Sequence, residues 1–202
     1  MPEAGIGIEP FFLEGARGPL FCLHLSPITP LPRGSLLYLH PFAEEMHKSR
    51  RMAALQARAL AQNGFAVLQV DLTGCGDSAG DFGDAAWTGW LDDAQRAHDW
   101  LRQKTTRPVT LWGLRTGALL AAELACQLPD VQGLLLWQPV ADGSLFLNQF
   151  LRIKLASEML TDGQSRTGTK ELLAQLDGGQ SVEVGGYLLS PAMARELGSR
   201  KL

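Results

Sequence analysis

The stretch that decides the fold of this chain is Gly113-Leu114-Arg115-Thr116-Gly117. An apolar, strand-like run at 109–112 precedes it, and a run with helical spacing at 118–125 follows it. A strand, a sharp turn between glycines and a helix form the setting in which a G-x-S-x-G motif presents a catalytic serine. Here Arg115 takes the serine's position, and a protonated guanidinium cannot attack a carbonyl carbon. The pattern therefore predicts the backbone of a nucleophile turn without its nucleophile.

On either side of this turn, apolar runs alternate with helical ones. We expect strands at 35–39, 65–70, 109–112, 133–137 and 182–188, helices at 48–62, 87–103, 144–160, 171–176 and 191–197, and a hairpin of 11–14 with 20–25. Near-continuous apolar strands that alternate with helices favour a parallel sheet covered on both faces. We predict a three-layer α/β/α sandwich with a mostly parallel sheet, in one domain over residues 1–202.

Within that domain, three parts are expected. Residues 10–140 form the core, and residues 144–177 form a helical insertion after residue 140 that resembles a cap. A strand and a helix follow at 181–197. The helix at 144–160 is apolar around most of its circumference, so we expect it to serve as a cap or core helix, or else to contact a partner or a membrane surface.

Composition excludes several classes of protein. The net charge of −3 argues against a general nucleic-acid binder, and no apolar run is long enough to span a bilayer. The N-terminus has no signal-peptide pattern, and three widely spaced cysteines suit a reducing cytoplasm. We expect no cofactor, because Gly74-x-Gly76-x-x-Ala79 is not followed at once by a helix, and no metal, because His40, Glu44 and His47 match no common zinc spacing.

Three turns follow three of the predicted strands, at the edge where open α/β sheets bind ligands. They are His40-Pro41-Phe42, the segment 71–78, and the turn at Arg115. In this order and at these spacings they resemble the α/β-hydrolase superfamily. The resemblance implies that the first turn lends a backbone N–H to an oxyanion hole and that 71–78 is a structural signature. It also implies that the last two strands of such a sheet are missing from residues 1–202.

A narrower resemblance rests on three blocks, 81–93, 111–115 and 146–152. These blocks are similar to the bacterial group named exosortase A system-associated hydrolase 2, and the similarity runs from about Pro10 onward. The resemblance implies that arginine at the nucleophile position belongs to the group. It also implies a connection to exopolysaccharide and protein-sorting pathways.

The candidate ligand-binding residues are Arg115, Thr116, Phe42 and His40. Arg115 at the N-terminus of a helix could form a pocket for a carboxylate or phosphate. Alternatively, Arg115 pairs with Glu44 or Glu45 and plugs the old site. Both interpretations remain open at this point.

No catalytic residue can be assigned from the sequence. In the superfamily an acid and then a histidine follow the nucleophile, but the four histidines here, His24, His40, His47 and His98, all precede Arg115. Ser78 and Cys75 are weaker candidates for another nucleophile. We therefore expect a non-catalytic protein that binds an acidic or acyl ligand or a protein partner, and that associates with itself or another protein. The alternative is an atypical esterase, thioesterase or acyltransferase.

Overall fold

The computed structural model describes residues 5–29, 31–162 and 168–202. Its main sheet contains β1 (Ile6–Gly15), β2 (Gly18–Pro27), β3 (Gly34–Leu39), β4 (Phe65–Val70), β5 (Val109–Leu114) and β6 (Val131–Trp137), in the order β1-β2-β4-β3-β5-β6. Strands β4, β3, β5 and β6 are parallel, and β2 pairs with β1 and β4 in antiparallel fashion. The predicted mostly parallel sheet with a leading hairpin is confirmed.

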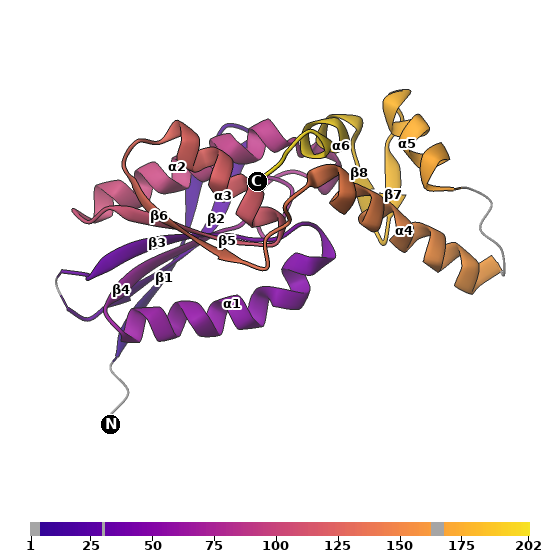
Figure 1. The fold of residues 1–202 in the computed structure, drawn as a ribbon. Coiled ribbons are helices and arrows are strands. Elements are labelled where there is room, and N and C mark those ends of the chain that lie inside the picture. The colour runs from indigo at the N-terminus through magenta and orange to yellow at the C-terminus, as the bar shows by residue number, and fades with distance from the viewer. Residues whose placement is uncertain (1–4, 30, 163–167) are drawn as a thin grey trace.

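Three helices cover the sheet: α1 (Glu44–Gln62) on one face, and α2 (Trp87–Lys104) and α3 (Thr116–Gln127) on the other (Figure 1). The predicted three-layer sandwich is therefore confirmed. All six residues of β3 are buried, as expected for a central strand with helices on both sides. A short 3-10 helix, η1 (Phe82–Asp84), precedes α2.

The sheet ends at β6 within the described part of the chain. β6 is less buried than β3, and Leu134 in its middle is 44% exposed. β6 is therefore an edge strand of the main sheet among the described residues.

The remaining elements are α4 (Gly143–Asp162), α5 (Thr169–Asp177), β7 (Val182–Val184), β8 (Tyr187–Leu189) and α6 (Pro191–Gly198). They gather at one end of the sheet (Figure 1). The inner face of α4 is part of the core through Phe146, Leu147, Phe150 and Leu151, whereas Leu145 and Leu160 are 64% and 90% exposed. None of the described helices combines the length and the hydropathy that a bilayer-spanning helix needs.

The prediction of one strand at 182–188 is wrong. Residues Gly185 and Gly186 both have positive φ, 57° and 85°, and they connect β7 and β8 as a two-residue hairpin turn. Such turns need positive φ at both central residues, which glycine adopts without strain. The two short strands form their own sheet and do not extend the main one. Residues 163–167, within the predicted insertion 144–177, lie outside the described residues.

Candidate functional site

The backbone of Arg115 has the strained geometry of a nucleophile turn. Its φ is 55° and its ψ is −116°, a conformation that costs about 1–3 kcal/mol in a residue other than glycine. Three hydrogen bonds hold it: its N–H donates to the carbonyl of Trp137 at 3.0 Å, and its carbonyl accepts from Ala118 at 3.1 Å and Val140 at 3.2 Å. The sharp turn predicted between β5 and α3 is therefore present and held in a strained conformation.

The two flanking glycines allow this turn to pack tightly. A Cβ on Gly113 would lie 2.4 Å from the carbonyl oxygen of Gly117. A Cβ on Gly117 would lie 2.2 Å from the carbonyl oxygen of Leu39, at the end of β3. Real Cβ atoms do not approach backbone atoms so closely, so both positions require glycine.

The side chain of Arg115 forms an ion pair with Glu45, in the first turn of α1. Its Nε lies 3.2 Å from Glu45 Oε1, and its Nη1 lies 3.4 Å from the carbonyl oxygen of Gln138. Glu44 instead lies 3.8 Å from Lys48. The structure thus selects Glu45 from the two predicted acidic partners. About a third of the Arg115 side chain, 31%, stays exposed.

His40 supports its own turn and has no free ring nitrogen. Its Nδ1 lies 2.8 Å from the carbonyl of Pro41, and its Nε2 accepts the N–H of Leu72 at 3.2 Å. Complete burial lowers the pKa of the ring, so His40 is neutral at ordinary pH. The predicted contribution of His40 to ligand binding can hold only through the backbone of its turn.

Phe42 and Thr116 also turn their side chains into the protein. Phe42 is 0% exposed and packs edge-on against a ring of aromatic side chains, namely Phe82, Trp90, Phe146 and Phe150. Thr116 is 1% exposed, and its hydroxyl has no hydrogen-bond partner among the described residues. Any contact of Phe42 with a ligand would have to come from its backbone, as in an oxyanion hole.

Two grooves meet at Arg115. The first lies against α1 and is lined by Pro41, Glu45, Lys48, Ser49, Leu114, Arg115 and Gln138. The second lies against α4 and is lined by Arg115, Val140, Ala141, Asp142, Leu145, Phe146 and Gln149. Among the described residues, no histidine lines either groove.

The segment 71–78 is held by internal hydrogen bonds and connects to β2. Ser78 Oγ accepts the N–H of Phe21 at 2.8 Å and donates to the carbonyl of Asp71. Cys75 is buried, and burial raises the pKa of its thiol, so thiolate formation is disfavoured. Both weaker candidates for a nucleophile are therefore structural.

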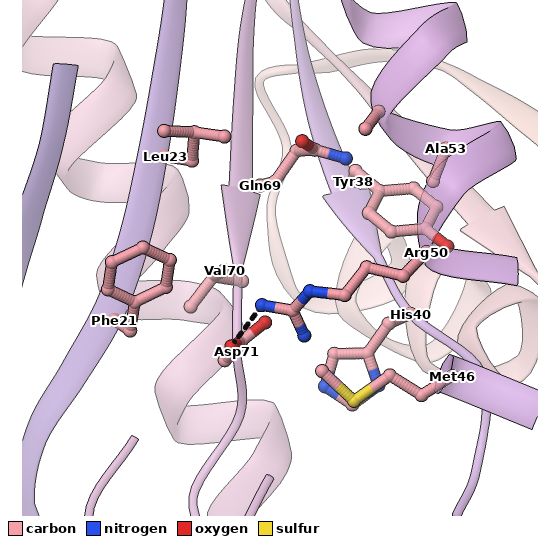
Figure 2. Close-up of a pocket in the computed structure, with 11 residues that line it drawn as sticks. Phe21, Leu23, Tyr38, His40, Met46, Arg50, Ala53, Gln69, Val70 and Asp71 are labelled. Atoms are coloured by element: carbon pink, nitrogen blue, oxygen red, sulfur yellow. Dashed lines mark hydrogen bonds and ion pairs between the residues drawn. The ribbon is translucent and has the colours of Figure 1, made fainter. Parts of the chain in front are cut away.

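A small cavity of about 90 Å³ lies between α1 and the sheet (Figure 2). Arg50 of α1, which lines the cavity, lies 2.7 Å from Asp71 Oδ2, which also accepts the N–H of Asp77 at 3.2 Å. Burial raises the pKa of Tyr38, which lines the cavity, to about 12. Sequence reasoning missed Arg50, because no local pattern shows which helix residue pairs with Asp71. Arg50 and Asp71 therefore pair with each other and help to hold the segment 71–78 in place.

The buried ring of His40 makes stability depend on pH. The pKa of His40 in the folded state lies below the usual 6.5. Below pH 6.5, the histidine therefore binds a proton in the unfolded chain but not in the folded one. We expect the free energy of unfolding to fall as the pH drops from 7 to 5.5, by up to about 1.4 kcal/mol per pH unit. His40→Gln should flatten this slope, measured by urea denaturation.

The exposed His47 provides the control. His47→Gln should keep the slope of the unaltered protein. Equal slopes in the two variants would show that His40 is not the group responsible. The buried carboxyl of Asp93 has a raised pKa and titrates with the opposite sign, but it is common to both variants.

The described residues contain no cluster of histidine, cysteine and carboxylate side chains that could hold a metal ion. What the site offers is a strained arginine turn, backbone N–H groups of two turns, and two grooves. Within the part of the chain that the structure describes, neither groove contains a serine or cysteine paired with a histidine.

Comparison with known proteins agrees with the fold. A family model described as serine aminopeptidase, S33, matches residues 30–174. Human protein ABHD12B is 34% identical over 91 residues, which make up 45% of this chain and 24% of that protein. The chain thus spans about a quarter of the length of this curated relative.

Two solved structures are also similar. An α/β serine hydrolase without a lid from Xanthomonas campestris is 28% identical, with a TM-score of 0.55 over 66% of this chain and 62% of that one. Est1E from Butyrivibrio proteoclasticus, solved with ferulic acid, is 16% identical, with a TM-score of 0.73 over 94% of this chain and 70% of that one. The second likeness shows the fold alone. Since the family match covers well over half of its residues, the chain belongs to the serine aminopeptidase S33 family of the α/β-hydrolase superfamily.

Proposed function

We propose that this chain is a non-catalytic α/β-hydrolase-fold protein that binds an acidic or acyl-bearing ligand at Arg115. We further propose that it is of the exosortase A system-associated hydrolase 2 type and acts in the cytoplasm. The observation that carries the proposal is the guanidinium of Arg115, which stands on a strained nucleophile turn between two grooves.

Among the described residues, the turn lacks a nucleophile and a histidine base, which supports the non-catalytic role. A general base must come within hydrogen-bond reach of the group it deprotonates. Both nitrogens of His40 are engaged, and no described histidine lines the grooves at Arg115. An arginine at the turn can form no acyl-enzyme.

The electrostatics support binding of an acid. Arg115 precedes the first turn of α3, where unpaired N–H groups and the helix dipole give partial positive charge. Lys48, which lies 3.8 Å from Glu44, also lines the first groove. Only part of the guanidinium's five-donor capacity is used by Glu45 and Gln138.

Acetate tests this proposal as the smallest carboxylate. We expect the unaltered protein to bind acetate at millimolar concentrations, measured by NMR shifts of backbone amides around residue 115. Arg115→Gln should weaken binding by about tenfold or more, because loss of a charge-assisted hydrogen bond costs about 1.5–3 kcal/mol. Arg58→Gln, which removes an exposed arginine of α1, is the matched control and should bind normally. Equal binding by the Arg115→Gln variant would exclude the proposed site.

An atypical esterase, thioesterase or acyltransferase is the alternative function. The observation in its favour is the strained backbone of Arg115, which the fold retains. That alternative requires a nucleophile and a base other than the residues at this turn.

A further inference from the structure

Arg115 is the residue that the two grooves share. The first, of about 300 Å³, contains charged and hydroxyl side chains from α1, including Glu45 and Lys48. The second, of about 200 Å³, is lined by apolar side chains, among them Val140, Leu145 and Phe146, together with Asp142 and Gln149. Leu145 is exposed in the second groove, so a ligand whose acid group lies on Arg115 can place an apolar body along this side chain.

The charges around Arg115 select among acids. Besides Arg115, the first groove contains Lys48, 3.8 Å from Glu44, and Lys201 lies 3.7 Å from Asp142 of the second groove. With Glu45 on Arg115, each of these three cations already faces one carboxylate. A dianionic phosphate would find no surplus positive charge here. A carboxylate carries a single charge, and its planar shape matches the guanidinium fork.

Glu45 occupies the place that a ligand carboxylate would take. Its 3.2 Å contact with Arg115 Nε is longer than the 2.7–2.9 Å of a strong charge-assisted hydrogen bond. Its other oxygen, Oε2, is buried with no partner among the described residues. A displaced Glu45 would remain in the first turn of α1, where the helix dipole favours a negative charge. The existing pair is therefore poorly satisfied and open to exchange.

We propose that the ligand is a monocarboxylic acid on a short acyl chain. Its carboxylate replaces Glu45 on Arg115, and its chain lies in the second groove along Leu145 and Phe146. This inference rests on the proposed function and adds to it the class of ligand and the exchange with Glu45.

Calorimetric titration with acetate, hexanoate and 1-hexanol tests the inference. Hexanoate has four more methylenes than acetate, and each fully buried methylene is worth about 0.8 kcal/mol. Because the groove is partly open, we expect hexanoate to bind about tenfold tighter than acetate, not the full factor of about two hundred. 1-Hexanol, which lacks the carboxylate, should bind at least about tenfold more weakly than hexanoate.

Two substitutions test the contacts of the acyl chain and of the carboxylate separately. Leu145→Gln should remove most of the advantage of hexanoate and leave acetate binding unchanged. Leu145 is 64% exposed, so the core stays intact, and Leu160→Gln on the same helix, at a residue 90% exposed, is the matched control. Glu45→Gln removes the competing carboxylate and should tighten the binding of both acids.

The outcomes distinguish the two proposals. If acetate and hexanoate bind equally well through Arg115, the acyl groove is wrong and the acid site stands. If Leu160→Gln weakens hexanoate as much as Leu145→Gln does, the chain does not lie in the second groove. Weaker binding in Glu45→Gln would overturn the exchange. If neither acid binds, or if Arg115→Gln leaves both affinities unchanged, the proposed function fails as well.

Discussion

Replacing Gly117 by alanine is expected to destabilise the fold by about 3 kcal/mol or more. The new Cβ would lie 2.2 Å from the carbonyl oxygen of Leu39 and 2.7 Å from that of His40. Both are backbone atoms at the end of the buried strand β3, so they cannot move aside as a flexible side chain could. Relief of the clash would require α3 to shift away from the sheet. Urea denaturation measures the loss.

Gly89 provides a matched control within α2. A Cβ at Gly89 would meet nothing within 4 Å, and glycine inside a helix costs roughly 0.5–1 kcal/mol relative to alanine. Gly89→Ala should therefore leave stability unchanged or raise it. If Gly117→Ala were as stable as the unaltered protein, the close contact between α3 and β3 would be wrong.

The second prediction is that Arg115→Ser should not create a serine hydrolase. The serine would stand on a suitable backbone turn, but a hydroxyl without a base is a poor nucleophile near neutral pH. His40, the histidine of the neighbouring turn, has both ring nitrogens engaged and a lowered pKa. We expect no stoichiometric labelling of the variant by a fluorophosphonate probe. Rapid labelling that His40→Gln then abolishes would show that His40 can leave its bonds and act as a base.

The strand, turn and helix around Arg115 could be predicted because their signals are local. The apolar residues of β5, the two glycines and the helical run of α3 lie within twenty residues of one another. The choice of Glu45 over Glu44 could not be made from sequence. It depends on how α1 is rotated against the end of the sheet, which no local pattern specifies.

Two elements differ from their predictions for physical reasons. The leading hairpin was expected at 11–14 and 20–25, but β1 and β2 run over Ile6–Gly15 and Gly18–Pro27. Gly7 and Pro10 argue locally against a strand, yet on an edge strand pairing with β2 on one side is enough. At Gly185-Gly186 the turn signal was present, and the apolar residues on either side concealed it.

The directions of the side chains in the candidate site could not be predicted from the sequence either. The sequence predicts that the turns with His40, Phe42 and Thr116 lie at one edge of the sheet, and the structure places these turns there. Which way each side chain points is set by tertiary packing, and all three are buried. The groove along Leu145 depends on how α4 meets the turn at Arg115, a contact between segments that the sequence does not link.

The most direct test of a non-catalytic Arg115 turn is hydrolysis of p-nitrophenyl acetate and p-nitrophenyl butyrate by the purified protein. Removing one triad member usually costs several orders of magnitude in rate, and here the nucleophile is replaced and no described histidine lines the grooves at Arg115. We predict rates equal to the buffer background for the unaltered protein and for Arg115→Ala. Steady turnover with saturation kinetics, retained in Arg115→Ala, would contradict the account and show that another nucleophile operates.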